Sequence, residues 1–449
     1  MDEPPIGDLH FLTGRLRGEG RSAEEGLEEL LKRIAVLNPR VNALREIMGD
    51  SARREACRVD RLIQTGRDPG PLAGVPVAVK EIIDTTPAVC SAGFEFLSDY
   101  RPERDAPVVR RLRRAGAIII GVAISDPGAF GVRTAATHHP QAAGRTVGGS
   151  SGGSGAALAA GFCAAALGTD TGGSIRIPAA CCAIAGLKPT RGRVPTVGVR
   201  PLVWSLDHVG PMARSVADLT AMQRVLDSRF RHTRKAGSTA AVVGHDPRYY
   251  RDAETLVVRG MENALRACRT LGAEVREVTL PDPEEMQNVH LVIFCAESAA
   301  YYHTAFPDQR HSYPEAAGLL IELANRHTGH QYVHAMRQRA DITRRVDALF
   351  DSVDVLLAPT TPVLPPAHDA ETVELNGKAI DFTSAMILYT CLFDHTGNPV
   401  VAMPSAYYGP GIASSIQVIG PTDRDGDVLA FAERLEAALD LEIDYEVRL

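Results

Sequence analysis

Apolar residues follow two different spacings along this chain. In residues 22–37 they recur with the 3.6-residue period of an amphipathic helix, and the capping box of Ser22 and Glu25 marks its start. Elsewhere they form short unbroken runs rich in valine and isoleucine, which are typical of strands buried on both faces. The clearest of these runs are residues 75–79, 117–123 and 353–358.

The same patterns predict alternating helices and strands over most of the sequence. Asn38 and Pro39 are expected to end the first helix, and residues 125–147 and 206–214 read as a loop and a connection. The basic segment 229–237 fits a linker or a surface loop equally well. Strands alternate with helices and the sequence contains no internal repeat. We therefore predict an α/β fold with a large sheet that helices mostly cover. Further helices are expected at 49–65, 105–115, 156–160, 215–226, 253–271, 426–439 and over most of 284–350, and further strands at 162–167, 240–243, 274–280, 398–404 and 414–419.

Composition narrows the function classes. A length of 449 residues suggests two or three domains, although large single sheets exist. With 45% hydrophobic and 23% charged residues the chain reads as a soluble globular protein, and its net charge of −7 argues against a general nucleic-acid surface. No apolar run approaches the roughly 18 residues of a membrane span, and the N-terminus lacks the pattern of an export signal. We therefore expect a cytoplasmic protein without membrane or nucleic-acid partners.

The cysteines and histidines do not form a metal-binding pattern. None of the eight cysteines belongs to a CxxC pair, and several lie in apolar runs, so we expect reduced, buried thiols. The neighbouring Cys181 and Cys182 have no further ligand close in sequence, and His138 and His139 lie in a loop without spaced partners. We expect neither a metal nor a cofactor.

Two glycine- and serine-rich turns stand out from this background. Residues 148–154 read Gly-Gly-Ser-Ser-Gly-Gly-Ser and residues 168–178 read Gly-Thr-Asp-Thr-Gly-Gly-Ser-Ile-Arg-Ile-Pro, with one short apolar unit between them. Glycine lets the backbone approach a ligand closely, and consecutive turn N–H groups form a concavity that binds anions. A serine hydroxyl beside such a concavity can attack a carbonyl whose oxyanion the N–H groups then hold. The pattern predicts a hydrolase site.

Two other interpretations of these turns fit less well. A phosphate-binding P-loop needs a lysine after the glycine turn, and neither turn is followed by one. The residues around Ser150 formally fit the Gly-x-Ser-x-Gly elbow of α/β-hydrolases, but residues 138–147 before it are unsuited to the central strand that this elbow requires. A Ser-His-Asp triad stays open in principle, since histidines follow Ser150.

The turns, together with several other segments in the same order, closely resemble the amidase signature family. The segments are 74–81 (Gly-Val-Pro-Val-Ala-Val-Lys-Glu), the two turns themselves, 186–190 (Gly-Leu-Lys-Pro-Thr), 206–214 (Leu-Asp-His-Val-Gly-Pro-Met-Ala-Arg), 357–362 (Leu-Ala-Pro-Thr-Thr-Pro) and 417–421 (Gln-Val-Ile-Gly-Pro). The resemblance implies a large mixed central sheet covered by helices on both faces. It also implies one domain over residues 1–449, with a helical part at about 1–70, a signature core at about 71–225 and a variable helical wall at about 284–350.

The family uses a Ser–cis-Ser–Lys triad, and the resemblance assigns its members by motif. Ser174 matches the nucleophile, Ser150 matches the bridging serine whose preceding peptide bond is cis, and Lys80 matches the general base. A lysine can act as a base only when neutral, so burial must lower its pKa from about 10.4, and the end of an apolar strand is a suitable place. The oxyanion donors implied are the backbone N–H groups of Thr171, Gly172, Gly173 and Ser174.

Three further residues are expected to support the site. Ser151 reads as a turn residue that hydrogen-bonds backbone, with contact to the reacting groups left open. Asp170 and Arg176 flank the nucleophile and are interpreted as a buried polar pair that braces the turn, without a chemical role.

The substrate is the least determined part. Residues 122–130 depart from the family's usual Gly-Lys-Thr-Asn pattern, and the wall at 284–345 includes a tyrosine- and histidine-rich patch (Tyr301, Tyr302, His303, His311, Tyr313). We expect a stand-alone monomer or homodimer that acts on small or aryl amides, with esters and carbamates as extensions. Two alternatives stay open, the amidase-like subunit of a tRNA-dependent amidotransferase and a non-catalytic scaffold, although the intact triad positions argue against the scaffold.

Overall fold

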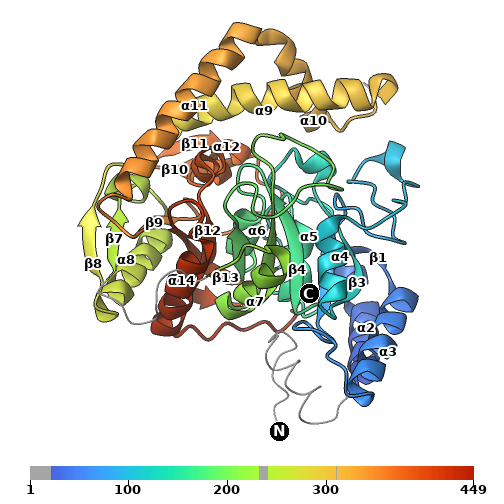
Figure 1. Cartoon of the computed structure of the whole chain (residues 1–449). Helices are drawn as coiled ribbons and strands as arrows, with labels where there is room; N and C mark the ends of the chain where they lie inside the picture. The colour runs from blue at the N-terminus through green and yellow to red at the C-terminus, as the bar shows by residue number, and fades with distance from the viewer. Residues whose placement is uncertain (1–21, 232–240, 310, 449) are drawn as a thin grey trace.

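The computed structural model describes residues 22–231, 241–309 and 311–448. Its centre is one eleven-stranded sheet with both parallel and antiparallel neighbours (Figure 1). Parallel pairing joins β3, β2 and β4 on one side and β9, β7 and β8 on the other, while the strands between them pair antiparallel. Across the sheet the order is β1 (Leu44–Ile47), β3 (Ile118–Ala123), β2 (Pro76–Lys80), β4 (Ala165–Asp170), β6 (His208–Ala213), β5 (Ala185–Lys188), β12 (Val400–Gly409), β13 (Ile412–Ile419), β9 (Val355–Pro359), β7 (Val242–His245) and β8 (Glu274–Glu277).

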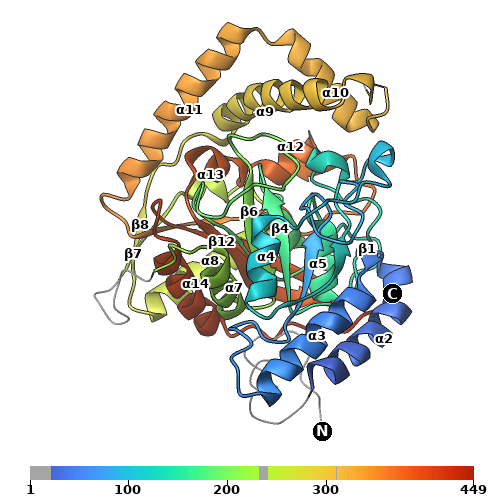
Figure 2. The ribbon, with the colours of Figure 1, turned by 45° about the vertical axis from the view of Figure 1, so that its right-hand side comes forward.

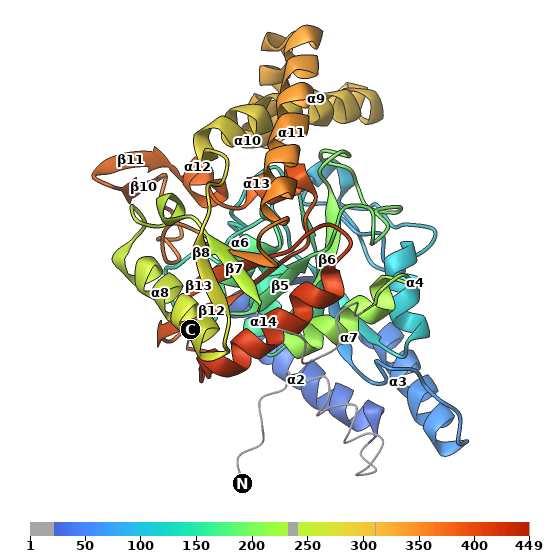
Figure 3. The ribbon, with the colours of Figure 1, turned by 60° about the vertical axis from the view of Figure 1, so that its left-hand side comes forward.

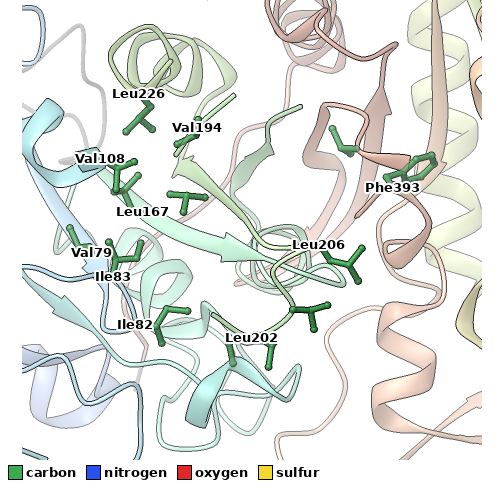
Figure 4. Packing of buried hydrophobic residues seen from close by; sticks show 14 of the residues in the cluster. Val79, Ile82, Ile83, Val108, Leu167, Val194, Leu202, Leu206, Leu226 and Phe393 are labelled. Atoms are coloured by element: carbon green, nitrogen blue, oxygen red, sulfur yellow. The ribbon is translucent and has the colours of Figure 1, made fainter. Parts of the chain in front are cut away.

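Helices cover both faces of this sheet, as the α/β expectation requires. Val77 and Val79 of β2 belong to the apolar cluster that contains α4 (Pro107–Arg114), part of which Figure 4 shows. Ala78, between them, belongs to the cluster on the opposite face that contains α5 (Gly152–Ala159). The remaining helices against the sheet are α2 (Ala23–Val41), α3 (Gly49–Gln64), α6 (Arg176–Cys181), α7 (Val216–Leu226), α8 (Thr255–Thr270) and α14 (Asp425–Leu439).

Helix α5 is buried along its whole length, which its small residues make possible. It contains only glycine, alanine, serine and one leucine. A Cβ atom at Gly153 would lie 2.4 Å from the carbonyl oxygen of Ile124 and 2.6 Å from that of Ala43. Only glycine permits so close an approach of backbone to backbone. The helix that follows the first serine turn is thereby held deep inside the molecule.

A second group of helices stands off one side of the body. Figures 1 and 2 show α9 (Pro283–Ala305), α10 (Glu315–Leu323) and α11 (Gly329–Leu349) together there, beyond α12 (Phe382–Ile387) and α13 (Cys391–Thr396). We call α9, α10 and α11 the helical arm. Figure 3 shows a two-stranded hairpin, β10 (Thr372–Leu375) and β11 (Lys378–Asp381), next to α12. The arm confirms the expectation of mostly helical structure over 284–350.

Several boundaries differ from the sequence prediction for identifiable reasons. Helix α2 continues past Asn38 and Pro39 and ends where Asn42 adopts a left-handed conformation with φ 51°. The Asn38 side chain does not stop the helix, because it bonds the backbone of residues 43 and 44 instead. The strand expected at 162–167 lies three residues later, as β4, and therefore carries Asp170 at its end.

The segment 206–214 is a strand rather than a connection. It forms β6, which lies between β4 and β5 and is buried throughout. Gly210 and Pro211 resemble a turn in sequence. The strand tolerates them on its β5 side because β5 pairs there only with Met212 and Ala213. The segment expected as a linker at 229–237 lies mostly outside the described residues, as does the N-terminus to residue 21. β1, β5, α6, α12, α13 and the β10–β11 hairpin were not predicted.

Candidate active site

Lys80 lies at the carboxyl end of β2, near the middle of the parallel part of the sheet. It is fully buried, and its Nζ donates hydrogen bonds to Ser150 Oγ at 2.7 Å and to Thr169 Oγ1 at 2.8 Å. Burial lowers the pKa of Lys80 to about 7, against the opposing effect of carboxylates of which Asp126 is the strongest. The amine is therefore mostly neutral at mildly alkaline pH.

Ser150 is held in the first turn through its backbone. The peptide bond between Gly149 and Ser150 is cis. The Ser150 carbonyl accepts hydrogen bonds from the Asp126 N–H at 3.1 Å and from Thr134 Oγ1 at 3.3 Å. With the backbone fixed on that side, the Ser150 hydroxyl faces Lys80.

Ser151 has a structural set of contacts. Its Oγ donates to the Thr169 carbonyl at 3.2 Å and accepts from the Thr169 N–H at 3.3 Å. Its backbone N–H donates to the Ser174 carbonyl at 3.2 Å. The two side-chain contacts join the first turn to β4, and the backbone contact joins it to the second turn. Ser151 therefore sets the position of one turn relative to the other.

The second turn is built around the Asp170 carboxylate. Asp170, at the end of β4, accepts hydrogen bonds from the N–H groups of Gly173 at 2.6 Å and Ile175 at 3.1 Å. It also forms a fully buried ion pair with Arg176, in which Nε lies 3.0 Å from Oδ2. The Arg176 guanidinium holds the pKa of Asp170 well below its usual range, despite burial. Ser174, between these contacts, is 5% exposed.

These contacts change the expected set of oxyanion donors. The Gly173 N–H is already used by Asp170, so the groups left from the sequence expectation are those of Thr171, Gly172 and Ser174. Gly173 has φ +133°, and a Cβ atom there would lie 2.4 Å from Thr390 Oγ1. The glycine therefore permits a turn conformation in which its own N–H braces the loop.

Arg176 joins the turn to the C-terminal part of the chain. Its Nη1 donates to the Thr390 carbonyl at 2.8 Å and to Gln417 Oε1 at 2.7 Å, and its Nη2 donates to Asp394 Oδ2 at 2.7 Å. Burial and the neighbouring Asp170 raise the pKa of Asp394 far above its usual range, so we assign it a proton. Asp394 was missed in the sequence, whereas Gln417 was part of a motif but was given no role.

Two other buried carboxyls near the site were also missed. Asp126 accepts from the Gly131 N–H at 2.6 Å, and burial raises its pKa to about 7. Asp207 accepts from Thr171 Oγ1 at 2.7 Å, and burial raises its pKa to about 6. Both lie in segments that the sequence marked only as a loop and a connection, so periodicity gave no signal for them.

Helix α9 of the arm lies against the second turn. The imidazole of His290 is nearly buried, and a Cβ atom at Gly172 would lie 3.2 Å from its Cε1 atom. One helical turn on, the Phe294 ring is 5.9 Å from that of Phe130, and the Phe130 ring is 5.1 Å from that of Tyr302. The two segments expected as substrate walls, 122–130 and 301–313, thus meet through Phe130 and Tyr302.

Metal binding and membrane insertion find no support in the described residues. Over 22–231, 241–309 and 311–448, no group of three or more His, Cys, Asp or Glu side chains is arranged to hold a metal ion. Within the same ranges, no helix combines the length and apolar character needed to cross a membrane. All eight cysteines are free thiols, and seven are buried. A metal- and cofactor-free reaction stays a prediction.

Comparison with known proteins identifies relatives over nearly the whole chain. The Amidase family model matches residues 25–429. An amidase from Pseudomonas putida is 34% identical, with 92% of each chain covered. A glutamyl-tRNA(Gln) amidotransferase subunit from Carboxydothermus hydrogenoformans is 31% identical, with 95% of this chain and 96% of the relative covered.

Solved structures of amidases share the fold of this chain, in agreement with the sequence relatives. An amidase crystal structure superposes with a TM-score of 0.89 at 31% identity, covering 96% of this chain and 99% of the other. A bacterial aryl acylamidase of the amidase signature enzymes superposes with a TM-score of 0.86, but at 24% identity it supports the fold alone. The family match, the relatives and the shared sheet lead to one conclusion: the chain belongs to the amidase signature family.

Proposed function

We propose that this protein is a serine amidohydrolase that cleaves linear C–N bonds of small or aryl amides through an acyl-enzyme. The observation that carries the proposal is the buried hydrogen bond of 2.7 Å from Lys80 Nζ to Ser150 Oγ, in a setting that lowers the pKa of the lysine to about 7. A neutral lysine can accept a proton, and a serine hydroxyl needs a base before it attacks a carbonyl.

In the proposed acylation, a proton passes along three residues in succession. Ser174 Oγ forms a bond to the carbonyl carbon as its proton passes to Ser150 Oγ, whose own proton passes to Lys80 Nζ. The carbonyl electron pair moves onto oxygen, which the N–H groups of Thr171, Gly172 and Ser174 are assigned to hold. Collapse of this intermediate breaks the C–N bond, and the protonated Lys80 returns a proton through Ser150 to the leaving amine.

Deacylation repeats the same proton path with water. Water attacks the acyl carbon as its proton passes through Ser150 to Lys80. The bond to the Ser174 oxygen then breaks, and that oxygen takes the proton back from Lys80 through Ser150. Asp170, Arg176 and Ser151 take no proton in this scheme, and their proposed role is to hold the turn that carries Ser174. No metal or cofactor enters any step.

The substrate range is proposed to be broad, extending to activated esters and carbamates. The test is a matched series of a 4-nitroanilide, a 4-nitrophenyl ester and an O-aryl N-alkylcarbamate. The ester should acylate fastest, and the carbamoyl-enzyme should deacylate slowly because nitrogen donation makes its carbonyl less electrophilic. Ser174→Ala should lose activity on all three, and an acyl adduct found on Ser150 would contradict the assignment.

A role within an amidotransferase is the second candidate, favoured by the 31% identity to the glutamyl-tRNA(Gln) amidotransferase subunit over nearly full length. In that role the chain would hydrolyse glutamine and pass ammonia to a partner. Inertness of the isolated protein toward the whole series, with glutaminase activity appearing only when amidotransferase partner subunits are added, would move the assignment to this candidate.

A further inference from the structure

His290 of α9 occupies a position that the proposed triad does not use. Its Nε2 would lie 3.3 Å from a Cβ atom placed on Gly172, whose N–H is one of the proposed oxyanion donors. The Gly172 carbonyl accepts a hydrogen bond of 2.6 Å from Thr390 Oγ1. Gly172 is therefore held through its carbonyl and flanked by His290 on the side where a side chain would project.

The orientation of the His290 ring is set by a second histidine. His290 Nδ1 and His395 Nε2 are 3.0 Å apart, so one proton lies between them. His395 is held in turn by Arg339 of α11, whose Nε donates to the His395 carbonyl at 3.1 Å. Burial lowers the pKa of His290 to about 4 and that of His395 well below its usual value, with Arg339 and Arg191 adding to the effect on His395. Both rings are neutral at pH 7.

The surroundings of His395 decide which nitrogen carries the proton. His395 Nδ1 is buried and finds no hydrogen-bond partner among the described residues. If that nitrogen carried the proton, a buried donor would be left without an acceptor, which is rarer in proteins than an unused acceptor. The proton of His395 therefore belongs on Nε2, where it is donated to His290 Nδ1. This leaves the proton of His290 on its own Nε2.

A neutral N–H group of the helical arm thus lies beside Gly172 of the proposed oxyanion turn, 3.3 Å from the Cβ position of that glycine. Within the described ranges, His290 Nε2 has no protein partner. We infer that His290 Nε2–H is a substrate-positioning donor that selects acyl groups with an ether-type oxygen one or two bonds from the scissile carbonyl carbon. Examples are the alkoxycarbonyl group of an N-aryl carbamate and the alkoxyacetyl group of an alkoxyacetyl amide. The inference rests on the proposed function.

The position of His290 favours an acceptor oxygen on the acyl chain over the carbonyl oxygen itself. Backbone N–H groups of the turn are assigned to the oxyanion, whereas His290 flanks the turn on its side-chain side. Phe294, one helical turn away with its ring 5.5 Å from that of His290, continues the same wall as an apolar surface. The wall therefore places a donor beside an apolar ring, and a polar group placed in this way can fix the orientation of a ligand.

The test compares substrates that differ by one exchange of oxygen for CH2. One pair is methyl N-(4-nitrophenyl)carbamate and propanoyl 4-nitroanilide, and the other is methoxyacetyl and butanoyl 4-nitroanilide. His290→Phe keeps a ring of similar volume and removes the donor. It should lower kcat/KM about tenfold for the oxygen-bearing member of at least one pair, and no more than about twofold for the CH2 members. Ratios of variant to wild type cancel the intrinsic reactivity of each substrate.

Controls separate a positioning role from a structural one. His290→Gln retains an N–H donor at the distance of Nε2 and should restore most of the oxygen preference. Acylation of Ser174 by 4-nitrophenyl butanoate, whose acyl chain carries no such oxygen, should change by no more than about twofold in both variants. His334→Phe, on the exposed surface of α11, should change neither substrate pair.

A readout independent of turnover is the 15N spectrum of histidine-labelled protein, assigned with His290→Gln. It should report the Nε2–H tautomer for His290. An Nδ1–H tautomer, or an equal loss for both members of each pair in His290→Phe, would overturn the inference while leaving the amidohydrolase proposal intact. If wild type cleaves none of the four substrates, the proposed function itself fails.

Discussion

The two serine turns and the helical arm are built in opposite ways. In α5 and α6, which follow the turns, every residue is buried. The turn carboxylate of Asp170 accepts hydrogen bonds from three backbone N–H groups and pairs with the Arg176 guanidinium. In the 21-residue α11, only Ala335, Arg339, Ile342 and Val346 are buried. Leu319 on α10 is 60% exposed and Val333 on α11 is 53% exposed. The proposed reacting groups thus lie next to helices that are buried along their whole length.

The inner face of α9 brings the arm close to the second turn. There His290 approaches Gly172, and Phe294 packs against Phe130. We expect a substitution on that face to change the proposed substrate wall and to leave the hydrogen bonds of Lys80 and Ser151 in place. This difference suggests that the reaction is set in the core and the substrate preference in the arm. The predictions below test that division, from the largest expected effect to the smallest.

Removing the nucleophile should have the largest effect. Ser174→Ala is expected to lower kcat on a nitroanilide by at least about 10⁴-fold, because losing a nucleophile in a serine hydrolase removes the covalent path. Steady-state kinetics with an active-site titration would measure it. Ser151→Ala is the matched control, since the Ser151 side chain hydrogen-bonds only the Thr169 backbone among the described residues. It should cost about 1–3 kcal/mol of stability and leave a substantial part of the activity.

Removing the proposed base should have the next effect. Lys80→Ala is expected to lower kcat/KM by about 10²–10⁴-fold, the usual contribution of a general base. Circular dichroism and thermal melting would show that the variant is folded. Near-full activity in a folded Lys80→Ala protein would break the assignment of the core to the chemistry.

The two aspartates that share Arg176 should respond unequally. Asp170 is ionised, so Asp170→Asn removes one charge of a buried pair and should cost about 3–5 kcal/mol of unfolding free energy. Asp394 is assigned a proton, so Asp394→Asn replaces a neutral group by one of nearly the same shape and should cost less than about 1 kcal/mol. Denaturant unfolding measures both. Equal losses would show that the two carboxyls share the charge.

A substitution on the outer face of the arm should have the smallest effect. Val333→Ser, at an exposed position of α11, is expected to change unfolding free energy by no more than about 0.5 kcal/mol. Its kinetics on the nitroanilide should match wild type. A clear loss of activity would show that the outer face also contributes to function.

Much of the fold could be predicted from local patterns. The capping box at Ser22 and the buried valine run before Lys80 each determine an element through residues that are close in sequence. The prediction failed where local signals conflicted with the tertiary structure. Gly210 and Pro211 read as a turn but belong to a central strand, because pairing with β4 on one side outweighs their low strand preference.

The candidate site also contains features that local sequence could indicate and features that depend on the tertiary structure. Motif resemblance pointed to Lys80, Ser150 and Ser174, and their catalytic roles stay a prediction. It could not reveal that Asp170 uses the Gly173 N–H, because this depends on the conformation of the turn. Asp394 and His290 are more than 100 residues from the turn in sequence, and no periodicity connects them to it.

The central claim is that a neutral Lys80 activates Ser174 through Ser150. The most direct test is the pH dependence of Ser174 labelling by a fluorophosphonate, which needs no knowledge of the natural substrate. Because the pKa of Lys80 is about 7, its basic form accumulates as pH rises, so the labelling rate should rise with a midpoint near 7 and level off above it.

Asp126 also has a pKa of about 7, so Asp126→Asn is the control and should still show a rise. In Lys80→Ala the rate should be about 10²–10⁴-fold lower and the midpoint absent. The same midpoint in Lys80→Ala, or labelling at Ser150, would contradict the account.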